Sequence, residues 1–284
     1  MKQIVMEALE LQRRYQAGER DFREVNLSRT LLSGLSLVEA NLREAEMIEV
    51  NLSGAEMRGV NLREANLKGA DLSRADLQDA NLIGANLVGA NLRGANLAGA
   101  GLRGANVSEA DFSQANLSQA NLSEANLTDV TLSQAILRQA TLSRSKLIGA
   151  VLIKASLEGA NLTYTLLSLA NLEEANLTNA ILSGATLEEA NLTRADMSFA
   201  NLSGANLRAA VLFKANLRRA NVSWTTLRNA DLRSANLYQA SLSWANLSES
   251  KLSQAMLIDA NLSRANLRNA DLRGAIMPDG VTHE

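Results

Sequence analysis

A strict period of five residues runs through almost the whole sequence. Its unit reads Ala-Asn-Leu-x-x, and the Leu positions, which we call centres, recur from Phe22 to Met277 without an insertion or deletion. Of the 52 centres, 44 are Leu. In an α-helix, a residue five positions further along points about 140° away from the first, and in a strand an odd period places successive Leu residues on opposite faces. Neither element would therefore gather the Leu side chains on one side. A short extended piece followed by a turn points every Leu toward one axis, so the period predicts a solenoid with Leu and Ala inside.

Departures from the repeat recur every 20 residues, which sets the size of one coil. Trp224 and Trp244 stand 20 residues apart. Arg-Glu pairs follow the centre at residues 23–24, 43–44 and 63–64. We infer four five-residue units per coil, a square cross-section and about 13 coils. The alternative is a recent duplication with no structural meaning.

The array resembles the pentapeptide repeat family, whose unit is Ala-Asn/Asp-Leu-x-x. The resemblance covers residues 22–277, about nine tenths of the chain. It implies an all-β solenoid, a right-handed quadrilateral β-helix, whose handedness comes from the family alone. The flanking segments, residues 13–22 and 274–280, are similar to a bacterial and especially cyanobacterial subset, some of whose members act in cell-differentiation signalling.

The segment before the repeats has the spacing of a helix. Its apolar residues on one helical face are Ile4, Ala8, Leu11 and Tyr15. We expect a helix over roughly residues 3–16 that covers the first coil and ends before Gly18. A helix that binds a partner or a membrane surface is the alternative. The expected division is therefore a capping helix over 1–18, an uninterrupted β-helix over 19–277 and a tail over 278–284.

The composition excludes several classes of function. The chain has no Cys and only one His, His283, so it lacks material for a Cys-ligated metal site or a His-based catalytic site. Its 28 basic and 30 acidic residues give a net charge of −2, which does not indicate a nucleic-acid partner. No apolar run is long enough for a membrane span, and Glu7 and Glu10 interrupt any signal peptide. We expect a cytoplasmic protein without enzymatic activity, metal or cofactor.

Exposed aromatic residues are the best candidates for an interaction surface. Three of them, Tyr164, Trp224 and Trp244, fall on one face of the expected coils. Phe199 and Tyr238 fall on a neighbouring face, and Phe213 falls on another. Large apolar side chains outside a core favour a contact surface. Simple stacking between coils is the alternative interpretation.

Three other features vary along the chain. Residues 1–142 hold 14 basic and 18 acidic residues, whereas residues 143–284 hold 14 and 12. One coil has glycine at all four turns, Gly84, Gly89, Gly94 and Gly99, which predicts a bare belt. Between residues 131 and 156 no Asn or Asp precedes the centre, which we interpret as drift, a local change of turn type or a contact surface.

Together these features predict a protein-interaction or regulatory module that presents rigid solenoid faces to a protein partner. One alternative is a DNA mimic that binds DNA gyrase, as a branch of the resembled family does, although the charge is nearly balanced. A second alternative is a structural, self-associating rod, with a weak homodimer through the C-terminal end.

Overall fold

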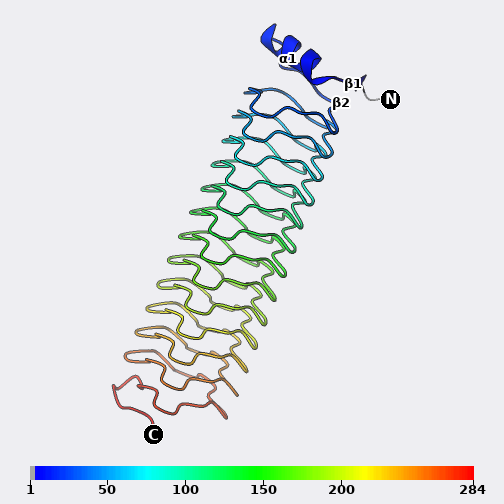
Figure 1. The fold of residues 1–284 in the computed structure, drawn as a ribbon. Helices are drawn as coiled ribbons and strands as arrows, with labels where there is room; N and C mark the ends of the chain where they lie inside the picture. Colours follow the sequence, from blue (N-terminus) through cyan, green and yellow to red (C-terminus); the bar gives the residue numbers. More distant parts are fainter. Residues whose placement is uncertain (1–3) are drawn as a thin grey trace. The chain divides into compact units, whose positions relative to one another are not determined.

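The computed structural model describes residues 4–284, in which parallel backbone bridges join residues 20 positions apart. Asn61 pairs with Asn81, for example, and the same spacing recurs over residues 21–141 and 146–276. This register confirms four five-residue units per coil. The chain divides into two compact units, one that ends at Thr141 and one that runs from Leu142 to Glu284. Within each unit the coils stack on one another (Figure 1).

Each five-residue unit makes one short extended piece and one turn. The Leu72 N–H donates to the Asn91 carbonyl of the next coil at 2.7 Å, and the Asn91 N–H donates back to Ala70 at 2.9 Å. The turn is closed by a bond of 3.1 Å from the Ala75 N–H to the Leu72 carbonyl. We call the two residues after a centre the first and second corner positions. The second, here Arg74, has a φ of 56°, as in type II turns.

The core consists of columns of Leu and Ala that have no access to solvent. Leu72 and Ala75 are fully buried, and the same is true of nearly every centre and every Ala two positions before it. Burial of one such Leu contributes about 1.5–3 kcal/mol, so these columns hold the coils together. In the last coil the centres are only half-buried, because no further coil covers them.

Asn side chains connect the coils outside the core, as the stacked repeat predicts. The Asn116 amide donates to Asn96 Oδ1 at 3.2 Å, and the Asn96 amide donates to Asp76 Oδ1 at 3.0 Å. The Asn116 Oδ1 also accepts the Ser118 N–H at 3.1 Å, which shapes the corner. The sequence predicts the ladder between coils but gave us no reason to expect this second bond.

The stretch over residues 131–156 keeps the same turns despite its missing Asn and Asp residues. Gln134 and Lys154 hold φ values of 59° and 57° at the second corner position. The turn bonds from Ala135 to Leu132 and from Ala155 to Leu152 are present. A local change of turn type is therefore wrong, and a contact surface here stays a prediction.

The N-terminal segment contains both a strand and a helix. Strand β1 (Ile4–Val5) pairs in parallel with β2 (Val25–Asn26), and helix α1 spans Ala8–Gln16. The helix expected over 3–16 is thus shorter, and Ile4 lies in a strand; residue 3 is outside the described residues. Ile and Val are residue types common in strands, in line with the pairing of this dipeptide with the first coil.

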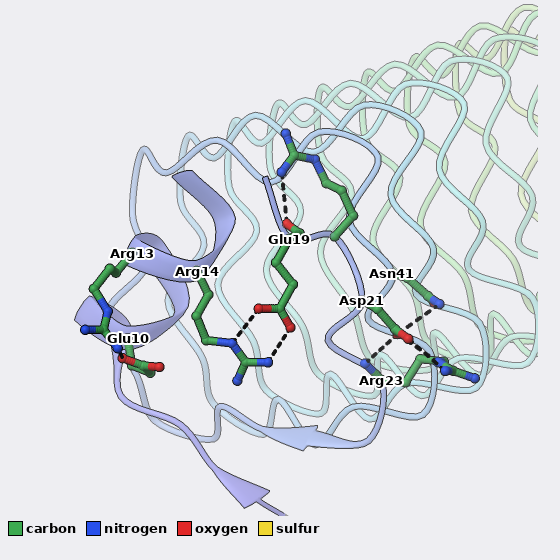
Figure 2. A network of polar contacts seen from close by, with 8 residues as sticks. Glu10, Arg13, Arg14, Glu19, Asp21, Arg23 and Asn41 are labelled. Atoms are coloured by element: carbon green, nitrogen blue, oxygen red, sulfur yellow. Dashed lines mark hydrogen bonds and ion pairs between the residues drawn. The ribbon is translucent and has the colours of Figure 1, made fainter. Parts of the chain in front are cut away.

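Helix α1 lies against the first coils of the N-terminal unit. Leu11 is fully buried, and the Tyr15 hydroxyl donates to the Val38 carbonyl at 3.1 Å. Arg14 forms an ion pair with Glu19, where Nε lies 2.7 Å from Oε2 (Figure 2). The hydrogen bond from Arg14 holds the pKa of the Glu19 carboxyl below its usual range. These contacts support the expected capping role, which stays a prediction until the helix is removed.

The C-terminal residues fold back onto the last coil. Ile276 forms an antiparallel bridge with Thr282, and the His283 N–H donates to the Ala275 carbonyl at 2.8 Å. The expected tail over 278–284 is therefore paired with the last coil along one edge.

Candidate interaction surface

The candidate surface is built from side chains at the second corner position. This position has positive φ at 37 non-glycine residues, a conformation that disfavours large side chains. Trp224, Trp244, Tyr164 and Phe199 nevertheless occupy it, with φ values of 62°, 61°, 56° and 60°. All four are exposed, so the core does not require them. An aromatic residue at such a corner therefore needs an explanation outside the fold.

Trp224 and Trp244 form a parallel stack on adjacent coils. Their ring centroids lie 4.7 Å apart and their planes differ by 8°, close to the spacing of about 4.8 Å between neighbouring strands. The expected proximity of the two rings is confirmed. Trp224 is 62 % exposed and Trp244 is 43 % exposed.

Arg264 completes this stack at its C-terminal end. Its guanidinium carbon lies 4.4 Å from the Trp244 ring centroid, a distance at which a cation is attracted to the ring face. Arg264 is absent from the residues predicted for the surface. It stands 20 residues after Trp244, so the same one-coil spacing that pairs the two tryptophans could have identified it.

Tyr164 shares the corner with the tryptophans but does not contact them. Gly184 and Gly204 occupy this corner in the two coils between Tyr164 and Trp224. The Tyr164 ring lies over Gly184, where an added Cβ would collide with it. The structure therefore places the three predicted residues in one column, with a glycine interval that separates Tyr164 from the Trp pair.

The other three predicted residues lie at two further corners, each beside a cation. The six aromatic residues therefore do not form one patch, and their use as a contact surface stays a prediction. The guanidinium or ammonium group lies between 5.1 and 5.9 Å from the ring in the pairs Phe199–Arg219, Tyr238–Arg218, Phe213–Lys214 and Phe213–Arg233.

The predicted bare belt of glycines is bare at Gly89, where nothing lies within 4 Å of an added Cβ, but not at its other three corners. Side chains at the second corner position extend over the same corner of the following coil. The Glu64 side chain covers Gly84 in this way, with Cγ 3.4 Å from the place of an added Cβ, and Asp79 covers Gly99. The expectation is wrong at these covered corners because it considered only the residues within one coil.

The ionisable groups near the corners are arranged for ion pairing. The hydrogen bond from the Arg273 side chain lowers the pKa of Asp271 to about 2, and Arg233 lowers that of Asp231 in the same way. Burial raises the pKa of Asp76, but hydrogen bonds outweigh this effect and lower the pKa below its ordinary value. The largest lowering effect comes from the Arg58 side chain. A general acid needs the opposite shift. These carboxylates serve as hydrogen-bond acceptors.

Residues 4–284 contain no group of His, Cys, Asp or Glu side chains that could hold a metal ion. Within the same residues, no helix has the length and apolar character to cross a membrane. What the surface can do chemically is stack planar groups on its exposed rings and exchange ion pairs at its corners.

Comparison with known proteins gives repeated matches along the chain. A family model described as pentapeptide repeats matches eight segments, which are residues 21–59, 55–94, 75–114, 95–134, 125–163, 170–208, 215–254 and 245–278. No curated protein matches the sequence.

Several solved structures are similar to the chain. One is HetL from the cyanobacterium Nostoc sp. strain PCC 7120, described as involved in heterocyst differentiation regulation, which is 32% identical over 98% of this chain and 100% of HetL, with a TM-score of 0.32. A thylakoid lumen protein of Arabidopsis thaliana is 30% identical over 40% of this chain and 73% of its own, with a TM-score of 0.29. The plasmid-mediated fluoroquinolone resistance protein QnrB1 is 22% identical over 63% of this chain and 82% of its own, with a TM-score of 0.39.

Proposed function

Since the chain belongs to the pentapeptide repeat family, whose fold is the right-handed quadrilateral β-helix, we propose that it is a non-enzymatic protein-interaction module. It presents its corners and flat faces to a protein partner and acts by binding. We place it in the cytoplasm, in line with its lack of Cys.

The observation that carries this proposal is the exposed Trp224–Trp244 stack. Neither ring contributes to the Leu and Ala core, and both stand where the backbone disfavours a large side chain. Stacking offers only about 0.5–1.5 kcal/mol in return. Trp is one of the residue types enriched among the anchors of protein interfaces, so binding supplies the reason for their position.

Replacement of both tryptophans tests the proposal. Trp224→Ala combined with Trp244→Ala should leave the melting temperature nearly unchanged, because the core is intact. When wild type and the double variant are each used to capture binding proteins, the double variant should fail to retain the protein that wild type retains. A large fall in melting temperature with capture intact would make the stack structural and reject the proposal.

Self-association is a second candidate, favoured by the last coil. The N–H groups of Leu262, Leu267 and Leu272 find no acceptor among the residues that the structure describes, and their side chains are only half-buried. An open edge of this kind pairs readily with another chain. Sedimentation of the full chain distinguishes a monomer from the weak homodimer that this edge would form.

The gyrase-binding alternative receives no such support from the surface. A DNA mimic needs dense negative charge, whereas the corner carboxylates pair with arginines, as Glu188 does with Arg208 and Glu249 does with Arg228. A supercoiling assay with DNA gyrase tests it directly, and inhibition by the full chain would restore that alternative.

A further inference from the structure

Apolar side chains gather on one flat side of the C-terminal unit. Tyr164 and Leu169 stand at the second positions of two consecutive corners of one coil, and Leu166 lies between them. We call these three residues the apolar row. Ile148 stands one coil earlier, at the corner that Leu169 occupies. The four residues are between 36 % and 61 % exposed. Exposed apolar residues grouped in this way mark an interaction surface, whereas single ones need no explanation.

The fold does not require apolar residues at these places. Leu169 and Tyr164 have φ values of 61° and 56°, in the region that disfavours side chains. Leu166 stands where most units have Asn, so it cannot make the bond between coils that Asn216 makes to Asp196 at 3.0 Å in the same unit. A contact with another molecule supplies the reason for both departures.

The backbone register places three coils side by side across this surface. Lys146 pairs with Leu166, and Leu166 pairs with Thr186, in parallel bridges. At the corner, the Leu169 N–H donates to the Glu188 carbonyl of the next coil at 3.0 Å. The apolar row therefore lies in the middle coil. We define the leucine face by three consecutive segments, which are residues 144–149, 164–169 and 184–189.

The two outer coils of the leucine face carry opposite charge. Arg144 and Lys146 precede the apolar row, and neither forms an ion pair among the described residues. Glu188 and Glu189 follow the row. Glu188 pairs with Arg208, whereas Glu189 has no ion-pair partner within residues 4–284. The face thus has unpaired cations on one side of the row and an unpaired carboxylate on the other.

This order of charge is complementary to itself. When two copies pack face to face about a two-fold axis that runs along the apolar row, the first coil of one copy lies opposite the third coil of the other. Leu166 then meets Leu166 of the second copy. Lys146 lies opposite Thr186 and beside Glu189, and symmetry repeats this pair. A contact between identical surfaces needs such a reversal of charge across the axis, whereas a contact with a different protein does not.

The corner side chains extend the match. The Tyr164 ring lies over Gly184 in the third coil, so it faces Arg144 of the second copy, and a guanidinium is attracted to an aromatic ring. Side chains at the second corner position extend over the following coil, so Leu169 faces Ile148 of the second copy. The apolar row and the unpaired charges of the face therefore find suitable counterparts in the second copy.

We propose that the leucine face joins two copies of the chain in a dimer, with Leu166 at the two-fold axis and Lys146 paired with Glu189 of the other copy. The coils of the two C-terminal units run in opposite order. Apolar contact at the centre supplies affinity, and the ion pairs at the rim fix the orientation. This surface is distinct from the Trp224–Trp244 stack and from the last coil, so it does not depend on the proposed binding of another protein.

Sedimentation equilibrium of the full chain over a series of concentrations tests the contact. Leu166→Lys sets two like charges against each other at the axis and should weaken dimerisation about tenfold or more. The position accepts lysine, since Lys146 and Lys251 also precede a centre. Ile181→Lys is the matched control, because it makes the same kind of change at an exposed apolar residue on the neighbouring side of the coil. It should leave the dimer unchanged, and circular dichroism checks that both variants fold.

Two charge reversals test whether residues 146 and 189 face each other between copies. Lys146→Glu sets a carboxylate opposite Glu189, and Glu189→Lys sets an ammonium opposite Lys146. Each variant alone should therefore dimerise about tenfold more weakly than wild type. An equal mixture of the two variants should regain the wild-type affinity, because every carboxylate then faces an ammonium.

The inference is overturned if wild type stays monomeric at every concentration, if Leu166→Lys dimerises as wild type does, or if the mixed variants dimerise no better than either alone. A dimer that survives Leu166→Lys would assign self-association to another surface, such as the last coil. The Trp224→Ala and Trp244→Ala double variant should dimerise as wild type does, so a failure of the proposed function would leave this inference standing. Loss of the dimer in that variant would assign the contact to the Trp stack and overturn it.

Discussion

Replacement of Ala209 by glycine should stabilise the protein, which is the reverse of the usual effect of this change. Ala209 occupies a second corner position with a φ of 55°. An L-residue in this left-handed conformation costs about 1–2 kcal/mol, a penalty that glycine escapes. Glycine also makes the unfolded chain more flexible, which removes about 0.4–1 kcal/mol. The net gain is about 0.5–1 kcal/mol.

Ala98 supplies a control with identical chemistry. It occupies a first corner position, which is not among the residues with positive φ, and its side chain is also outside the core. Ala98→Gly gains no relief and should lower stability by about 0.4–1 kcal/mol. The two Ala→Gly changes therefore have opposite signs although both lie in turns of the same type.

The measurement is the midpoint of thermal unfolding, followed by circular dichroism on wild type and the two single variants. Ala209→Gly should raise the midpoint by about 1–4 °C, and Ala98→Gly should lower it by a similar amount. Destabilisation by both changes would show that positive φ is not costly at these corners. It would also remove the backbone argument for a functional Trp pair.

Three other outcomes follow from the core, the helix and the ion pairs. Leu182→Asp should abolish cooperative unfolding, because it buries an unpaired charge among fully buried Leu columns. The control Ser183→Asp, at a corner, should hardly change stability. Equal effects of the two changes would refute the assignment of Leu182 to the core and Ser183 to the surface. Deletion of residues 1–16 should promote association in sedimentation, and a monomer of unchanged stability would show that helix α1 is not a cap. The pKa of Asp271, lowered to about 2 by Arg273, makes its contribution to stability complete above the ordinary value of 3.8 and lost as the pH falls through 2. The difference in unfolding midpoint between wild type and Arg273→Gln should therefore shrink from pH 5 to pH 2, and a difference independent of pH would contradict the pairing.

The repeat could be predicted because one contact geometry recurs in every coil. The five-residue period placed Leu inside, and the 20-residue spacing placed Trp224 beside Trp244. Both expectations depend only on the distance along the chain, which the uninterrupted array keeps constant.

The remaining features depend on contacts that occur only once. Ile4 pairs with Val25 in the first coil, yet the same residue also fits the spacing of a helical face. The helical spacing therefore predicted the wrong element for this residue. Thr282 pairs with Ile276 in a segment without any period. The exposed face of Trp224 results from the small size of Gly204, and the sequence alone did not show which neighbouring side chain covers which corner.

The overlap of each corner side chain with the following coil gives the repeat a direction that its core lacks. Tyr164 needs a residue without a side chain 20 positions later, and Gly184 meets that need. A duplicated or deleted block of 20 residues would keep every Leu column in register, yet it would give corner side chains new neighbours. Such a change would conserve the fold and remake the surface in one step. We therefore expect that surface properties in arrays of this kind are inherited as ordered pairs of residues, each with its successor one coil later.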